Sequence, residues 1–203
     1  MTTTRLEAFS DGVLAIIITI MVLELHVPGE PTWAALSEVY PTFLSYLLSF
    51  IYVGIYWNNH HHMFQLSESV TGGILWANLH LLFWLSLIPF FTRWMDETGF
   101  ARVPVVVYGL NLLLAALAFS VLQQALVRHG GAGGGPGRRL SGALGRNVKG
   151  RISPLIYLAG CALSFVNPLF GVVAYAVAAA LWLVPDRGME RMVASGGGEA
   201  TES

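Results

Sequence analysis

Apolar stretches long enough to cross a lipid bilayer constrain this chain more than any other feature. They occupy residues 6–26, 40–62, 72–92 and 104–127, each close to the roughly 20 residues that a transmembrane helix needs. Charged residues make up 11% of the chain and hydrophobic residues 55%, whereas ordinary soluble domains carry about 25% charged residues. We therefore expect an all-α integral membrane protein.

The run from Ile152 to Val184 is too long for one crossing, because a single helix of that length would span about 50 Å. The pair Asn167-Pro168 divides the run, since proline disfavours helical conformation in the residue before it and often begins a new helix. This predicts two short helices at 153–167 and 169–184, and six transmembrane helices within a channel domain of residues 1–192.

The distribution of basic residues supports six spans and predicts that both termini are cytosolic. Six spans leave two arginines on one side of the membrane, Arg93 and Arg102. The other side collects the remaining basic residues: Arg5, Arg128, Arg138, Arg139, Arg146, Lys149, Arg151, Arg187 and Arg191.

Two segments outside the apolar stretches differ in composition. Residues 128–151 are glycine-rich and then basic, which predicts a flexible cytosolic linker near the anionic lipid surface. Residues 193–203 predict a disordered tail. The lone Cys161 excludes an intrachain disulfide. The formal net charge of −1 by itself says nothing about nucleic acid, and we expect no nucleic-acid partner.

The first apolar stretch carries an ionisable residue, Asp11, about 10 Å inside its predicted helix. Ionisable groups at such positions usually mark an ion path or a paired structural network, with Arg5 or a histidine as the partner in the second case. Helical spacing places another set of side chains on one face: Gly12, Ile16, Thr19, Ile20 and Leu23. This face fits a pore lining and a lipid-facing or packing surface about equally well.

The order Arg5-x-x-x-Phe9-Ser10-Asp11, followed by Ala15-Ile16, Thr19 and Leu23-Glu24, resembles the signature of the transmembrane-protein-175 family. That family comprises the lysosomal potassium channel and its prokaryotic relatives. The resemblance extends to Trp57-Asn-Asn-His60-His61-His62, to Asn78 and to Ile88-Pro89-Phe90. A chain of this length corresponds to the single-repeat prokaryotic form, which implies a homotetramer.

The resemblance also implies a function for the first helix. Four copies would line a central pore without a re-entrant filter loop, with Ile16 as the tightest constriction and Ile20 and Leu23 above it. Thr19 would assist potassium selectivity. A polar network would hold the pore helices, formed by Arg5, Phe9, Ser10, Asp11, Trp57, Asn78 and one of His60, His61 and His62, with His61 assigned to that place.

We therefore expect a potassium-permeable cation channel of a bacterial plasma membrane. Its partners would be other copies of itself, membrane lipids and monovalent cations; we expect no enzyme activity, no metal site and no cofactor beyond the permeant potassium ions. The alternative is a proton-coupled or proton-conducting transporter that uses Asp11, Glu24 and the histidines as a relay. A membrane scaffold without transport activity is a third interpretation.

Overall fold

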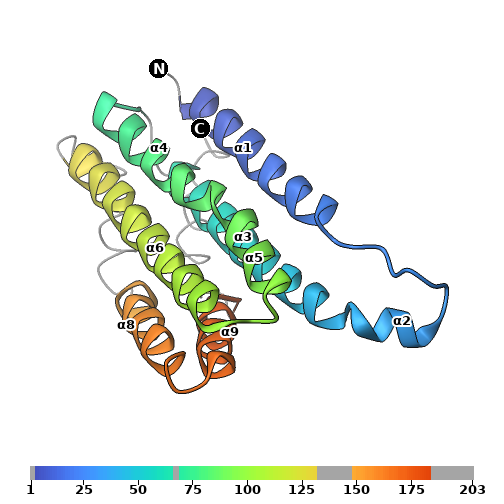
Figure 1. Cartoon of the computed structure of the whole chain (residues 1–203). Helices are drawn as coiled ribbons and strands as arrows, with labels where there is room; N and C mark the ends of the chain where they lie inside the picture. Colours follow the sequence, from blue (N-terminus) through green and yellow to red (C-terminus); the bar gives the residue numbers. More distant parts are fainter. Residues whose placement is uncertain (1–2, 66–68, 132–147, 184–203) are drawn as a thin grey trace, which may run out of the picture.

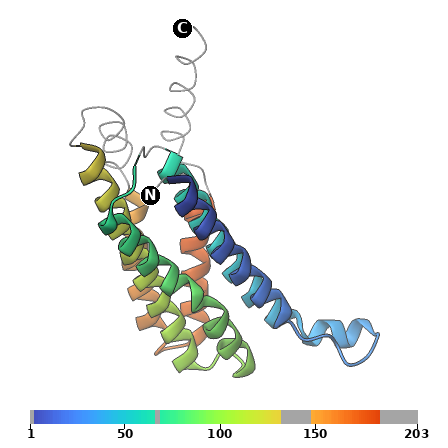
Figure 2. The same cartoon turned by 90° about the horizontal axis from the view of Figure 1, so that it is seen from above.

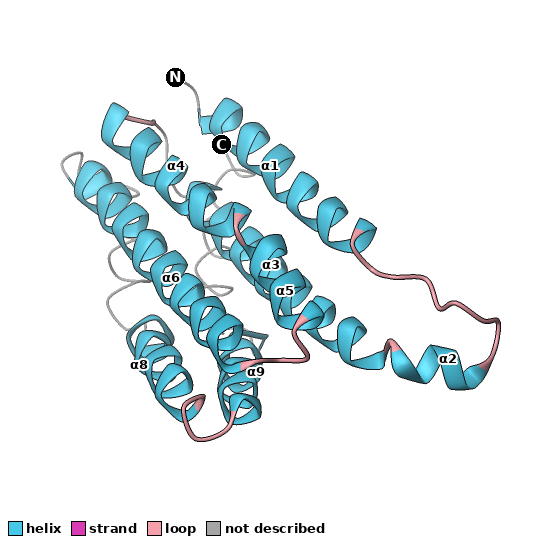
Figure 3. Ribbon diagram, viewed as in Figure 1, coloured by secondary structure: helices cyan, strands magenta, loops and turns pink. Residues whose placement is uncertain are grey.

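The structure, a computed structural model, describes residues 3–65, 69–131 and 148–183. All the regular elements in these ranges are helices (Figure 3), which confirms the all-α class. Their bounds are α1 Thr3–Leu23, α2 Trp33–Glu38, α3 Tyr40–Gln65, α4 Gly72–Ser86, α5 Ile88–Glu97, α6 Arg102–Gly131, α8 Val148–Leu163 and α9 Pro168–Leu183.

Three apolar helical segments of the described ranges are long enough to cross a membrane: Thr3–Leu23, Gly72–Glu97 and Arg102–His129. The 21 residues of α1 extend about 31 Å at 1.5 Å per residue, which matches a hydrocarbon core of about 30 Å. A shorter apolar helix follows at Pro168–Leu183. The chain is thus a membrane-embedded, multi-pass protein.

The apolar segment that begins at Gly72 is interrupted once, between α4 and α5. Pro89 lies in the first turn of α5 and has no amide hydrogen to donate to the carbonyl of the residue four positions earlier. Just before it, the Leu87 amide donates to the Trp84 carbonyl at 3.4 Å, which lies three residues earlier in the chain. Helical structure then continues to Glu97, beyond the boundary at 92 that hydropathy suggests.

Helices α6 and α8 reach into both ends of the region 128–151, which the sequence predicts to be a linker. Arg128 and His129 form part of the last turn of α6, where positive charge is favourable beside the free carbonyl groups of a helix end. Because both residues are polar, the hydropathy pattern ends this helix before them, at residue 127. The central part of the predicted linker, residues 132–147, and the predicted disordered tail at 193–203 lie outside the described residues.

Helix α1 lies at one edge of the bundle and packs on α3, α4 and α5 (Figure 1). Helix α6 contacts α4, α5, α8 and α9. The short α2 and the loop before it project away from the bundle (Figure 2), and α2 contributes no buried residue. The face of α1 that points away from the bundle therefore has no neighbouring helix among the described residues.

Helices α3, α6 and α8 contact Tyr175 of α9, which is fully buried. A Cβ atom added at Gly109 of α6 or at Gly160 of α8 would overlap the Tyr175 side chain, so glycine is required for this close approach. The Tyr52 hydroxyl donates to the Tyr175 carbonyl at 2.6 Å, which ties α3 to α9. Of the helices around Tyr175, α3 is the one that also packs on α1.

Candidate functional site

Helix α1 has a packed face and an exposed face. The packed face consists of Leu6, Ser10, Leu14, Ile17 and Met21, at the spacing of three and four residues that places side chains on one side of a helix. These side chains lie against α3, α4 and α5. These contacts hold α1 against the bundle, and they do not involve the opposite side of the helix.

The opposite side, which we call the exposed stripe, consists of Gly12, Ile16, Thr19, Ile20 and Leu23. Ile16 is 59% exposed, Ile20 43% and Leu23 81%, although apolar side chains are usually buried where the chain offers them a contact. The Thr19 hydroxyl donates to the Ile16 carbonyl at 2.8 Å. Its donor is therefore used within the helix, while the lone pairs of its oxygen remain as acceptors.

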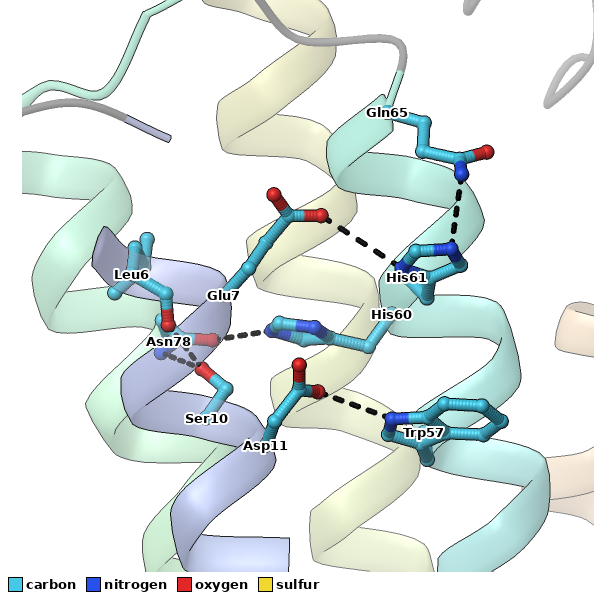
Figure 4. A network of polar contacts seen from close by, with 9 residues as sticks. All are labelled: Leu6, Glu7, Ser10, Asp11, Trp57, His60, His61, Gln65 and Asn78. Atoms are coloured by element: carbon cyan, nitrogen blue, oxygen red, sulfur yellow. Dashed lines mark hydrogen bonds and ion pairs between the residues drawn. The ribbon is translucent and has the colours of Figure 1, made fainter. Parts of the chain in front are cut away.

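A buried chain of hydrogen bonds joins α1 to α4 and α3 near Ser10, in the N-terminal half of α1 (Figure 4). Ser10 Oγ donates to the Leu6 carbonyl at 2.9 Å, and Asn78 Nδ2 donates to Ser10 Oγ at 3.0 Å. The Asn78 Oδ1 atom lies 2.7 Å from His60 Nε2. Because this oxygen can only accept, His60 carries its proton on Nε2 and donates. Ser10 and Asn78 are fully buried and His60 is 2% exposed.

A second, more exposed layer of contacts surrounds Asp11. Its Oδ1 atom accepts a hydrogen bond of 3.0 Å from Trp57 Nε1. The His61 ring stacks on Trp57 with 6.0 Å between ring centroids, and His61 Nδ1 lies 3.8 Å from Glu7 Oε1. Gln65 Nε2 lies 2.8 Å from His61 Nε2; since the amide nitrogen can only donate, the His61 Nε2 atom accepts.

The structure brings most of the predicted network residues together, and it assigns the histidines differently from the sequence. His60, not His61, bonds to Asn78, while His61 belongs to the layer around Asp11 and Trp57. The reason is the helical period: His60 continues the buried face of α3 through Tyr52, Val53 and Tyr56, whereas the next residue is rotated by about 100°.

Arg5 and Phe9 do not join this network among the residues that the structure describes. Both lie on the exposed side of α1, and Arg5 forms no ion pair among the described residues. Positions six apart on a helix do not face each other, unlike positions three or four apart, so Arg5 does not meet Asp11. The partner of Asp11 is instead the neutral indole of Trp57.

Glu7 is the contact that the sequence reasoning missed, and His60 was named there only as an alternative to His61. Glu7 lies four residues before Asp11 on the same side of α1, and His60 lies four residues after the buried Tyr56. The helical period would have found both residues if it had been applied to each helix separately.

Glu24, the other carboxylate of the predicted relay, lies at the far end of α1. Its Oε1 atom is 3.7 Å from Arg93 Nη1 on α5. Asp11 and Glu24 are separated by thirteen positions, or about 20 Å along the helix axis. Thr19 is the only polar side chain of α1 between them.

Comparison with known proteins relates this chain to one family of channels. Residues 5–89 match the family described as "Endosomal/lysosomal potassium channel TMEM175". A protein of a Chryseobacterium species named as a potassium channel is 51% identical over 191 residues, covering 94% of this chain and 97% of the relative. A human protein named as an endosomal/lysosomal proton channel is 33% identical over 112 residues, covering 49% of this chain and 22% of the human protein.

A solved structure supports the same relationship. The crystal structure of a lysosomal potassium-selective channel TMEM175 homolog from Chamaesiphon minutus superposes on this chain with a TM-score of 0.77 at 30% identity. The superposition covers 92% of this chain and 97% of the other. These relatives are named as channels, and none of these names describes an enzyme.

Proposed function

Because this chain belongs to the TMEM175 family, we propose that it is a potassium-permeable cation channel of a bacterial plasma membrane. The channel is a homotetramer in which four copies of α1 surround a central pore. Ile16 forms its narrowest point, Ile20 and Leu23 continue the constriction, and Thr19 assists selectivity. The polar contacts of Ser10, Asp11, Trp57, His60 and Asn78 hold each copy of α1 in place.

The observation that carries this proposal is the exposed stripe. Ile16, Ile20 and Leu23 repeat at helical spacing on the side of α1 that the other described residues leave uncovered. If four such stripes meet, they enclose a narrow apolar passage that can gate by dewetting and restrict larger hydrated species. Such a passage lacks a cage of carbonyl oxygens, so we expect only a modest preference for potassium over sodium.

The proposed topology has six spans and both termini in the cytosol. Its support is the distribution of charge: Arg93 and Arg102 are the basic residues on the outer side, and the remaining basic residues fall on the inner side. Helix α3 supplies a span in addition to the long apolar segments. The short helices α8 and α9 pack against each other, and they supply the last two spans.

A proton relay through Asp11, Glu24 and the histidines fits this geometry poorly. His60 and His61 lie near Asp11, and His80 accepts a local hydrogen bond of 2.9 Å from Trp84. The intervening distance of about 20 Å to Glu24 is lined along α1 by apolar side chains and Thr19. The pore along the exposed stripe requires no such transfer between carboxylates.

The test is the reversal potential across planar bilayers with unequal potassium and sodium, for the wild type and Ile16→Asn. We expect the wild type to carry a cation current with a modest potassium preference. Ile16→Asn should lose that preference and conduct more, because a polar ring no longer dewets. A relay would instead lose its flux in Asp11→Asn and respond little to Ile16→Asn.

The matched control is Val22→Asn. Val22 is also exposed on α1, at 44%, but it lies outside the stripe, so the same polar substitution there should leave the reversal potential unchanged. Equal effects of the two substitutions, or a wild type without potassium flux, would contradict the channel proposal. The second result would favour a scaffold.

A further inference from the structure

Arg93 of α5 lies between carboxylates of two helices at the Leu23 end of α1. Its Nη1 atom is 3.7 Å from Glu24 Oε1, and its Nε atom donates to Glu97 Oε1 at 2.7 Å. The planar guanidinium presents several donors in fixed directions and is suited to bridging two carboxylates. Among the described residues, this is the charged contact between α1 and α5.

Glu24 is joined to the turn that carries the last two apolar residues of the exposed stripe. Its amide donates to the Ile20 carbonyl at 3.2 Å, so the helical hydrogen bonding continues through Glu24. Leu23 lies within the same turn. The position of Glu24 is therefore coupled through the backbone to the positions of Ile20 and Leu23.

The α5 end of this contact has a firm support. The Thr42 hydroxyl of α3 donates to Asp96 Oδ1 at 2.5 Å, and Thr92 and Ser49 share a buried hydrogen bond of 2.7 Å. Both contacts tie α5 to α3 within one turn of Arg93. Arg93 thus extends to α1 from a helix that is itself held in place.

We propose that Arg93 is a positioning residue of the pore: through Glu24 it sets the spacing of Leu23 and Ile20 around the axis. This inference rests on the proposed channel function and deepens it. It also gives Glu24 a role as the anchor of the pore helix, distinct from proton transfer. The polar contacts around Ser10 and Asp11 hold one end of α1, and Arg93 holds the other.

The size of the effect follows from the exposure of the pair. The Arg93 side chain is 51% exposed and that of Glu24 27%, so the contact is a partly solvated ion pair. Pairs of this kind shift an equilibrium between two arrangements by roughly 1.4-fold to fivefold. We expect changes of that size in open probability or in relative permeability, without loss of assembly.

The experiment compares single-channel currents of the wild type, Arg93→Gln and Arg102→Gln in potassium and sodium. Arg102 is the other basic residue of the same side, at the start of α6, and is exposed. Both variants remove one positive charge per subunit, but only Arg93→Gln removes the contact with Glu24. We expect a shift of up to about fivefold in Arg93→Gln and no comparable shift in Arg102→Gln.

A double-mutant cycle shows whether Arg93 acts through Glu24. Glu24→Gln should reproduce the shift, and adding Arg93→Gln to Glu24→Gln should change nothing further. The inference is wrong if Arg93→Gln behaves like Arg102→Gln, or if its effect persists undiminished in the Glu24→Gln background. If Arg93→Gln does not assemble, Arg93→Lys is measured in its place, because it keeps the charge and loses the bridging geometry.

A separate measurement distinguishes failure of this inference from failure of the channel proposal. If the wild type carries no potassium current, the proposed function fails by itself. The positioning role is then tested with spin labels at Leu23→Cys in a Cys161→Ala background, in which the distances between copies are measured. The distances should broaden with Arg93→Gln and remain unchanged with Arg102→Gln; unchanged distances in both variants overturn the inference.

Discussion

Replacement of Asn78 by alanine is the sharpest test of how α1 is held. Asn78 is fully buried and forms two hydrogen bonds, one to Ser10 of α1 and one to His60 of α3. Asn78→Ala removes both bonds at once. The His60 Nε2 hydrogen loses its acceptor in a buried site, whereas the Ser10 hydroxyl still donates to the Leu6 carbonyl.

The magnitude follows from this inventory. Hydrogen bonds between helices of membrane proteins average about 0.6 kcal/mol, so two lost bonds give a lower figure of about 1.2 kcal/mol. A buried donor left without its acceptor costs about 1–3 kcal/mol, and His60 becomes such a donor. We therefore expect Asn78→Ala to lower the free energy of unfolding by about 1.2–3 kcal/mol.

The assay is reversible unfolding in detergent micelles, followed by circular dichroism, with Asn59→Ala as the matched control. Asn59 is half-buried on the neighbouring α3, and its side chain donates to the Ile55 carbonyl of its own helix at 2.7 Å. Its replacement should change the free energy of unfolding by no more than about 0.5 kcal/mol. If Asn78→Ala is no more destabilising than Asn59→Ala, the buried chain of hydrogen bonds does not hold α1.

Two further substitutions test neighbouring parts of the structure. Trp57→Phe removes the donor to Asp11 and should lower the free energy of unfolding by about 1 kcal/mol. The control, also measured by circular dichroism, is Trp84→Phe, which loses a hydrogen bond within one helix. Equal losses of stability in the two variants would argue against the contact between α1 and α3. Gly160→Ala forces a methyl group against the Tyr175 ring and should lower the free energy of unfolding by about 1–3 kcal/mol. In the control Gly54→Ala the added methyl group meets open space, so this change should be neutral or stabilising. Equal thermal unfolding temperatures of the two variants would refute the close packing of α8 on α9.

Much of the architecture was predictable because the bilayer imposes a length and a composition on every spanning helix. The apolar stretch that contains Ile16 and Leu23 satisfies both conditions in the sequence alone. The family was predictable for a different reason: Arg5, Phe9, Ser10 and Asp11 form a short motif with fixed spacing. Its assignment to the TMEM175 family is confirmed.

The contacts between helices were less predictable, since hydropathy contains no information on which faces meet. His60 and His61 are adjacent in sequence and chemically identical. The helical period places His60 on the buried face of α3, but the sequence alone does not show that Asn78 of α4 lies opposite it. Arg93 and Glu24 are far apart in the sequence. Their contact depends on the continuation of α5 beyond residue 92, a boundary that the apolar pattern placed too early.

The single hydroxyl in the exposed stripe bears on ion preference in the assembly that we propose. The Thr19 hydroxyl hydrogen is already donated to the Ile16 carbonyl, so the side chain presents acceptor lone pairs to its surroundings. Four such oxygens around an axis would favour a cation, which they can help to solvate, over an anion, which would need donors. Because Ile16 and Ile20 flank this position with apolar side chains, the contribution of Thr19 is confined to one short level of the passage. We therefore expect Thr19 to contribute only modestly to any preference among cations.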